Sequence, residues 1–474
     1  MTTTVTAAPA TLGAGLTEQR RRAVAIALLV SAQTVVMLDT SIVNVALPSI
    51  QTDLGLGPAA LSWVVNAYVL MFGGLLLLSG RAADLFGRRR MFMGGSIVFS
   101  VGSLLAAAAT NEAMLVGGRL VQGAGAAALS PAAMSLLLLA SPGEARARAM
   151  SMWGAASAVG GATGVFLGGV LAGTFGWSSV FLVTVPFSII SVVVAGRVLT
   201  EPGTVARHRF DWPGAVTSTG SVVALVHGCL GAASDTWTSP SVLTAFITSA
   251  ALAATFVHLE RHAPEPLVPL ELFRSRDLST GVLLALLGGA ARASTFVLVA
   301  LYLQQALHLA PRQAGLAMVP TSLAGFAVSL TLLPRVIRAL GPRRSLVVGL
   351  LVLSVGQLWL AYGPRDSGYL VAVLPGLMLI ATGVALSFTP TTMVIAEATP
   401  ESHTGLASGM AGSATQVGAA IGTAVFTAIG IAAGGSGASV LTPSGFTAAF
   451  AAAAAVSLVT AALAGLGHDP RRSR

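Results

Sequence analysis

The sequence of 474 residues contains no lysine, a single cysteine and few charged residues. Without lysine the chain cannot form the Gly-x-x-x-x-Gly-Lys-Ser/Thr loop that cradles phosphates, so an ATP-driven activity is not expected. Cys229 alone permits neither an internal disulfide nor a cysteine-based metal site. The seven histidines are scattered, and no carboxylate or histidine cluster suits hydrolysis or metal binding. We therefore expect no enzyme, no cofactor and no bound metal.

Charged residues make up 9% of the chain, against about 25% in soluble domains. Hydrophobic residues make up 54%, and the mean hydropathy is +0.83. Apolar runs of about 20 residues recur, each long enough to cross a bilayer as a helix. Because an alternation of period two is not sustained, helices rather than a barrel are expected. The sequence predicts an all-α integral membrane protein with fourteen transmembrane helices, near 23–47, 60–79, 91–109, 113–139, 150–174, 179–198, 212–232, 241–259, 278–306, 313–334, 345–362, 369–396, 404–432 and 445–466.

The distribution of arginine predicts the orientation of the chain. All 26 basic residues are arginine. When the connections are assigned to alternate sides, 22 arginines fall on one side and only Arg312 and Arg365 on the other. Arginine-rich loops stay in the cytoplasm, so we expect a multi-pass protein of the cell membrane with both termini cytoplasmic. The net charge of +9 then reflects topology and contacts with lipid headgroups, and no nucleic-acid partner is expected.

An internal repeat divides the chain into two similar halves. The segments 80–90 and 334–344 lie 254 residues apart, and each carries arginine at its second, tenth and eleventh positions and glycine at its eighth. Such repeats are typical of transporters whose halves rock around a site near the membrane midplane. The predicted division is a cytoplasmic tail at 1–22, a six-helix bundle at 23–198, a linker with two additional transmembrane helices at 199–277, a second six-helix bundle at 278–466 and a cytoplasmic tail at 467–474.

Asp39 and Arg119 lie inside predicted transmembrane helices. Placing a charged residue at the centre of a membrane helix costs about 2.5 to 3.5 kcal/mol of free energy, so each of the two is expected to have a function or a partner. An acid or a carbonyl partner would lower the free-energy cost of burying Arg119 the most, and Asp39 is the candidate acid. We interpret the two as a proton-coupling site, in which Asp39 is protonated from outside and deprotonates inward while Arg119 stabilises its anionic form. A buried ion pair with a purely structural role is the alternative.

Three segments carry a family resemblance. The segment 38–48 is similar to Leu-Asp-x-Thr-Ile-Val-Asn-Val-Ala-Leu-Pro, with Ser41 where threonine is usual. The segment 80–90 is similar to the loop between helices two and three of a large superfamily, and 119–127 is similar to its fourth-helix motif. The chain thus resembles the major facilitator superfamily, and within it the fourteen-helix drug:proton antiporters. The resemblance implies two six-helix bundles with an inserted helix pair, and proton-coupled efflux by alternating access.

The loop at 80–90 has a physical use of its own. Gly80 and Gly87 permit a tight turn and close helix approach. Asp84 can accept hydrogen bonds from the N-terminus of a neighbouring helix or from Arg88. We expect these four residues to form a conformational latch, and a charged turn without a switching role is the alternative.

Glycines recur every four residues in the fifth helix. Gly160, Gly164 and Gly168 share one helix face, which lets another helix approach to backbone contact. With Gly169 they are similar to the antiporter signature Gly-x-x-x-Gly-Pro-x-x-Gly-Gly, except that Val165 replaces the proline and removes its kink. A small-residue packing face explains the same glycines equally well.

Polar and aromatic residues on helices that line the cavity in this superfamily are candidates for a substrate pocket. Arg292 lies deep in the ninth apolar run. It would suit an anionic or carbonyl-rich substrate, but a partner on another helix or snorkelling to the membrane surface explains it as well. The other candidates, each of which can instead be an interhelical hydrogen bond or an interfacial anchor, are Trp63, Asn66, Tyr68, Gln122, Tyr302 and Gln304.

Three functions are compatible with these patterns. The first is proton-coupled efflux of amphipathic small molecules such as drugs or antibiotics, by a monomer in the lipid bilayer whose partners are the substrate and protons. The second is the dedicated export of one endogenous metabolite. The third is a membrane sensor or scaffold that does not transport, which would not depend on Asp39.

Overall fold

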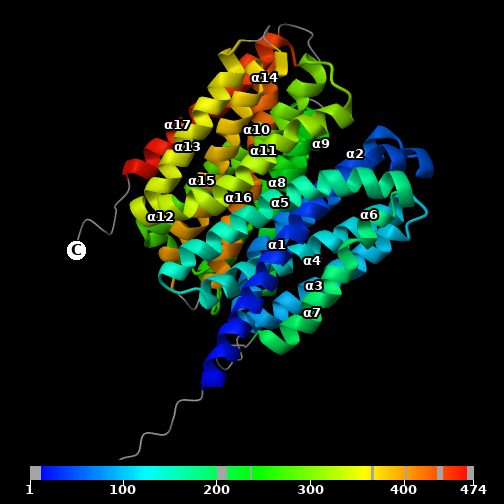
Figure 1. Ribbon diagram of the computed structural model, residues 1–474. Helices are drawn as coiled ribbons and strands as arrows, with labels where there is room; N and C mark the ends of the chain where they lie inside the picture. The colour runs from blue at the N-terminus through cyan, green and yellow to red at the C-terminus, as the bar shows by residue number, and fades with distance from the viewer. Residues whose placement is uncertain are drawn as a thin grey trace, which may run out of the picture.

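The computed structural model describes residues 12–199, 211–234, 237–364, 368–400, 403–434 and 441–466. Within these ranges the chain is almost wholly helical and has no strand (Figure 1). Fourteen helices there are long and apolar enough to cross a membrane, which confirms the number expected from the sequence. Residues 1–11 of the predicted N-terminal tail, 200–210 of the predicted linker and the whole predicted C-terminal tail at 467–474 lie outside the described residues.

The helices form two bundles and an inserted pair. The first bundle consists of α1 (Leu12–Leu54), α2 (Pro58–Phe86), α3 (Arg88–Ala107), α4 (Glu112–Ala140), α5 (Glu144–Phe175), α6 (Ser179–Leu182) and α7 (Thr184–Val198). The inserted pair consists of α8 (Trp212–Ser234) and α9 (Pro240–His262). The second bundle consists of η1 (Leu270–Arg274), α10 (Arg276–Leu301), η2 (Tyr302–Ala306), α11 (Pro311–Thr331), α12 (Leu333–Leu340), α13 (Pro342–Tyr362), α14 (Gly368–Ala372), α15 (Leu374–Glu397), α16 (Thr404–Ala433) and α17 (Pro443–Leu466).

The first helix is longer than the span predicted at 23–47. It starts before the three arginines at 20–22 and continues through Pro48. Proline is tolerated inside membrane helices where neighbouring helices support the backbone. Here Ile50 is fully buried in a cluster that includes Leu56 and Trp177. Tertiary packing therefore extends the helix past the residue at which the sequence pattern ends it.

Each bundle is held by a small set of helix pairs. In the first bundle α1 packs on α5, and α4 packs on both α2 and α3. In the second, α10 packs on α16, and α13 packs on both α15 and α17. The two bundles meet where α2 packs on α16 and where α5 packs on α11.

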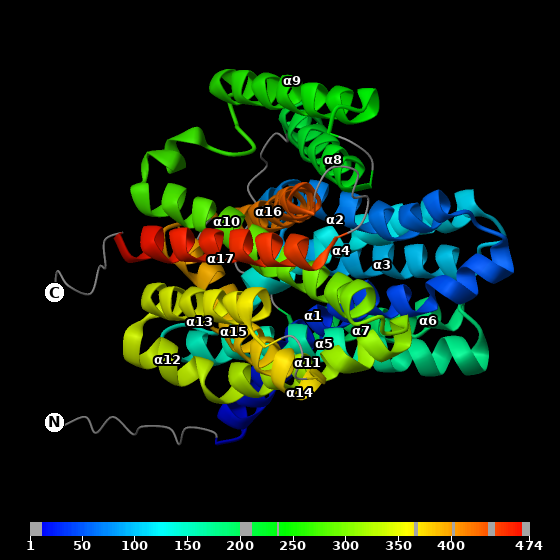
Figure 2. The ribbon, with the colours of Figure 1, turned by 90° about the horizontal axis from the view of Figure 1, so that it is seen from above.

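The inserted pair lies outside both bundles. Helix α8 packs against α2 and α16, which belong to different bundles, and α9 packs against α8. Figure 2 shows α9 at the outer edge of the molecule. Large apolar side chains such as Ile247 on α9 and Val216 on α8 are exposed, as expected for a surface that faces lipid.

The repeat seen in the sequence is also a repeat of helix packing. The missing side chains of Gly164 and Gly168 let α5 approach the backbone carbonyls of Leu38 and Ile42 on α1. At 254 residues further on, Gly418 and Gly422 let α16 approach the backbone of α10 in the same way. In both bundles, therefore, the first helix is packed backbone to backbone against the fifth.

The two similar loops also make similar contacts. Both turn at a glycine in the left-handed region, with φ of 102° at Gly87 and 82° at Gly341. The arginine two residues later donates to a carbonyl near the end of the last helix of the same bundle. Arg89 Nη2 lies 2.6 Å from Gly196 O, and Arg343 Nε lies 2.8 Å from Ala464 O. Each loop thus fixes its own bundle at the arginine-rich end of the molecule.

Candidate functional site

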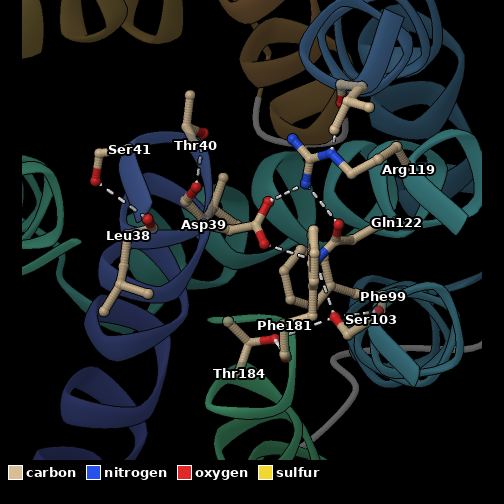
Figure 3. A network of polar contacts seen from close by, with 12 residues as sticks. Leu38, Asp39, Thr40, Ser41, Phe99, Ser103, Arg119, Gln122, Phe181 and Thr184 are labelled. Atoms are coloured by element: carbon tan, nitrogen blue, oxygen red, sulfur yellow. Dashed lines mark hydrogen bonds and ion pairs between the residues drawn. The ribbon is translucent and has the colours of Figure 1, made fainter. Parts of the chain in front are cut away.

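Asp39 points from α1 toward α4, and its carboxylate accepts from two side chains of that helix (Figure 3). Arg119 Nη1 lies 2.8 Å from Asp39 Oδ2, and Gln122 Nε2 lies 2.6 Å from Asp39 Oδ1. Asp39 is 0% exposed and Arg119 is 1% exposed. The two charges proposed from the sequence thus form a buried, hydrogen-bonded ion pair.

The Arg119 guanidinium has further partners. Its Nε donates to Val64 O at 3.0 Å, which ties α4 to α2, and its Nη1 also donates to Gln122 Oε1 at 2.6 Å. The guanidinium carbon lies 4.4 Å from the centre of the Tyr68 ring and 6.0 Å from that of Phe181. An arginine over an aromatic face is stabilised by the negative potential of the ring, so the cation is held from several sides.

Gln122 extends the network to two more helices. Its Nε2 also donates to Ser103 Oγ at 2.9 Å, and the Ser103 hydroxyl lies 3.0 Å from the Thr184 hydroxyl. Ser103 lies on α3 and Thr184 begins α7, so one network joins α1, α4, α3 and α7. Sequence reasoning did not identify Ser103 or Thr184 as site residues, because single hydroxyls in apolar helices are common.

Glycines bring α3 and α4 close enough for this network. A Cβ at Gly102 would collide with the backbone of Gln122, and a Cβ at Gly118 would lie 2.6 Å from Ala106 N. Gly125 on α4 contacts the backbone of Phe99 in the same manner. These glycines therefore place Gln122 within hydrogen-bonding distance of Ser103.

The glycine face of α5 packs beside Asp39. A Cβ at Gly164 would lie 2.6 Å from Leu38 O, and one at Gly168 would lie 2.9 Å from Ile42 O. Gly160 contacts the carbonyl of Thr34 one turn earlier, whereas a Cβ at Gly169 would make only an ordinary contact of 4.0 Å with Val45. Three of the four glycines are thus needed for the close α1–α5 packing.

Val165, which stands where the antiporter signature has proline, points away from α1. Its Cγ1 lies 3.6 Å from the position that a Cβ at Gly315 of α11 would take. The substitution therefore falls at the contact between the two bundles.

Asp84 joins the two bundles at the arginine-rich end. Its Oδ1 accepts from Gly405 N at 2.9 Å and its Oδ2 accepts from Leu406 N at 2.7 Å, both at the start of α16. Arg88 Nη2 also lies 2.8 Å from Asp84 Oδ1. A carboxylate at a helix N-terminus is stabilised by the helix dipole and the free amides. A side chain at Gly80 would collide with Gly405 O, so this glycine permits the contact.

His403 is the residue just before α16. Burial lowers the pKa of its imidazole below the usual value, the positive charge of Arg81 adds to this effect, and the opposing influence of the Asp84 carboxylate does not reverse it. Arg81 also donates to Pro266 O at 3.3 Å, which connects the loop at 80–90 to the segment after the inserted pair. With Asp84 bound to the start of α16, the surroundings of His403 thus favour its neutral form.

The predicted cavity residues do not gather in one place. Tyr68 and Gln122 belong to the Asp39 network, as described above. Trp63 is 41% exposed and stacks on His227 of α8, with ring centres 5.6 Å apart. Tyr302 is buried between Phe446 and Phe450 of α17. Asn66 is half-buried and Gln304 is exposed in the π-helical turn η2, so their place in a substrate pocket stays a prediction.

A second polar network lies in the second bundle. Gln357 Nε2 donates to Thr295 Oγ1 at 2.7 Å, and Ser457 Oγ donates to Gln357 Oε1 at 2.8 Å. Gln357 lies 254 residues after Ser103, at the matching place of the repeat. This network is neutral, and the nearby Arg292 does not join it: its side chain is buried beside Phe388.

Comparison with known proteins agrees with this architecture. The sequence profile of the Major Facilitator Superfamily matches residues 29–423 and also 281–474. The chain is 37% identical over 400 residues to the cephamycin export protein CmcT of Amycolatopsis lactamdurans, covering 84% of this chain and 82% of that protein. It is 34% identical over 466 residues to the puromycin resistance protein pur8 of Streptomyces alboniger, covering 95% and 92%. It is 33% identical over 387 residues to the multidrug resistance protein Stp of Mycobacterium tuberculosis, covering 81% and 72%.

Two solved structures show the same fold at low sequence identity. The fucose:proton symporter FucP of E. coli has a TM-score of 0.65 and 14% identity, covering 94% of this chain and 99% of that one. The human organic anion transporter MFSD10 has a TM-score of 0.64 and 14% identity, with the same coverage. The chain belongs to the Major Facilitator Superfamily and is a multi-pass membrane transporter rather than an enzyme.

Proposed function

We propose that this protein exports amphipathic small molecules in exchange for protons by alternating access. The proposal is carried by the Asp39 carboxylate, which is fully buried and accepts hydrogen bonds from Arg119 and Gln122. It is supported by relatives named for the export of, or resistance to, antibiotics and multiple drugs. The exported molecule and the proton use the same conformational cycle and compete for it.

Protonation of Asp39 changes the contacts between helices. The anion accepts from Arg119 and Gln122 at once, whereas a protonated carboxyl holds the guanidinium less strongly because the charge attraction is lost. Since the same Gln122 amide also bonds Ser103, a change at Asp39 is passed on to α3. Proton binding thus loosens the contact between α1 and the rest of its bundle, and proton release restores it.

Asp84 acts as the latch in this cycle. Opening the arginine-rich end requires the Asp84 carboxylate to leave the amides of Gly405 and Leu406. Each hydrogen bond to a charged group is worth about 1.5–3 kcal/mol. The arginine-rich end is the cytoplasmic end, both termini lie in the cytoplasm, and one chain with its two bundles forms the complete transport unit in the cell membrane.

Replacing Asp39 by asparagine tests the proposal. Everted membrane vesicles with an imposed proton gradient take up rhodamine 110 and rhodamine 123 as probes of export. We expect the Asp39→Asn variant to lose at least about tenfold in initial gradient-driven rate, because the amide cannot release a proton in this pH range. The matched control is Asp53→Asn, the same change at an exposed site on the same helix. Undiminished proton-driven uptake by Asp39→Asn would leave the ion pair a structural role only.

A dedicated exporter of one metabolite is the second candidate. It is favoured by relatives that are named for a single compound, cephamycin or puromycin. A growth assay in a pump-deficient host separates the two. Protection against several chemically unrelated drugs supports the broad exporter, and protection against one class supports the dedicated one.

A further inference from the structure

Arg292 is a buried arginine in the middle of α10. It stands sixteen residues after the first residue of a helix that begins at Arg276, and its side chain is 4% exposed. Its Nε, Nη1 and Nη2 are all shielded from solvent. The guanidinium therefore does not reach the membrane surface, which removes snorkelling as the explanation left open by the sequence.

Among the residues that the structure describes, no side chain or carbonyl accepts a hydrogen bond from this guanidinium. Arg119, the other arginine deep in the membrane, donates to three different acceptors. Within the described spans, the only acid more than six residues from a helix end is Asp39, which is already bound by Arg119. The described part of the chain thus supplies no counter-charge for Arg292.

The surroundings of Arg292 leave room for its planar group. Gly288, one turn earlier, has no side chain, and a Cβ there would lie 2.5 Å from Arg292 Nη1. The guanidinium carbon lies 5.9 Å from the centre of the Phe388 ring on α15. The next residue on α15, Thr389, contacts Gly154 of α5 in the other bundle. The arginine therefore lies near the junction between the bundles, where alternating access exposes a substrate to each side in turn.

We propose that Arg292 binds an anionic group of the exported molecule, such as a carboxylate, and that Phe388 contacts the aromatic or apolar part beside it. This inference rests on the proposed export function and names its substrate class: amphipathic molecules that carry a negative charge, including zwitterions. A guanidinium can donate two parallel hydrogen bonds to a carboxylate, which gives direction as well as attraction. The first bundle then binds the proton and the second bundle binds the anion.

The test compares two dyes that differ in one group. Rhodamine 110 has a free carboxylate, and rhodamine 123 is its methyl ester. Binding of each to the purified full chain in detergent is measured by fluorescence anisotropy. We expect the wild type to bind rhodamine 110 at least about tenfold more tightly, and Arg292→Gln to reduce that preference to about twofold or less. Arg292→Lys should retain part of the preference, since it keeps the charge but not the planar fork.

Controls keep the result interpretable. Arg276→Gln, an exposed arginine on the same helix, should keep the full preference. The unfolding temperature of Arg292→Gln should be equal to or above that of the wild type, because a buried charge without a partner is removed. A wild type that binds both dyes equally, or a preference that survives in Arg292→Gln, overturns the inference. The binding comparison needs no proton gradient, so it succeeds or fails independently of the Asp39→Asn transport test.

Discussion

Three charged residues lie deep in the membrane-spanning helices that the structure describes: Asp39, Arg119 and Arg292. Two of them neutralise each other, and the third is left with its charge unpaired among the described residues. With Asp39 ionised, this interior carries one net positive charge, and with Asp39 protonated it carries two. An anion bound at Arg292 would neutralise the charge that is left over when Asp39 is ionised.

The Asp39–Arg119 pair makes a prediction about stability. Removing one partner of a buried ion pair leaves an uncompensated charge and costs about 3–5 kcal/mol. We expect Arg119→Gln to lower the unfolding free energy by this amount. The double variant Asp39→Asn/Arg119→Gln should regain about 2 kcal/mol, because no buried charge is then left alone. Thermal unfolding of the purified variants measures both, and losses that merely add would show that the two side chains do not interact.

Close helix packing in this protein depends on glycines, which have no side chain to keep two helices apart. Along the α1–α5 and α10–α16 contacts the backbones touch through glycines, and a few hydroxyl side chains such as Ser41 and Ser294 reach across beside them. Such faces let the two helices approach to backbone contact. The polar groups around Asp39 likewise lie on closely packed helices, α1, α3, α4 and α7, rather than on loops.

Gly164 and Gly161 give a matched test of this packing. A Cβ at Gly164 would lie 2.6 Å from Leu38 O, whereas a Cβ at Gly161 would meet nothing within 4 Å. We expect Gly164→Ala to lower the unfolding free energy by about 1–3 kcal/mol through overpacking and to slow transport. Gly161→Ala should leave both unchanged or raise stability by up to about 1 kcal/mol, since alanine is the better helix former. Equal behaviour of the two variants would mean that close α1–α5 contact is not required.

The number of helices and the Asp39–Arg119 pair were predictable from the sequence, because both follow from the free energy of placing particular side chains in a bilayer. Apolar length is fixed by bilayer thickness, and a lone Asp39 in such a run must find a cation such as Arg119. Ser103 was not predictable, because its role depends on how α3 is rotated against α4. The same holds for Tyr302, an aromatic residue whose burial beside Phe446 is set by the rotation of α10.

At the scale of the whole molecule, Asp84 links the two bundles, and we expect His403 beside it to make this link sensitive to pH. The pKa of His403 is lowered in the docked state, so on separation of the bundles it returns toward about 6.5. As the pH falls through this value, the separated state binds a proton that the docked state does not. The docked state therefore loses stability as the solution becomes more acidic.

Distance measurements between spin labels test this link. Labels replace the exposed Arg90 in the first bundle and Arg335 in the second, after Cys229→Ala. Asp84→Asn should shift the population toward longer distances by at least about tenfold, because hydrogen bonds from two amides to a charge are weakened. Lowering the pH from about 7.5 to about 5.5 should cause a smaller shift in the same direction. An unchanged distance distribution in Asp84→Asn would contradict the role of Asp84. A pH response in His403→Gln equal to that of the wild type would contradict the role of His403.

The two similar loops differ in one respect. Both have the glycine turn and the arginine clamp, but the position 254 residues after Asp84 is Arg338, which is exposed and donates to Pro334 O of its own helix. The two loops therefore share the scaffold, and of these two matching positions only Asp84 carries a carboxylate that reaches across to the other bundle. We therefore expect the two ends of the molecule to open at unequal cost: the Asp84 contact favours one resting conformation, whereas the gradients of proton and substrate determine the direction of net transport.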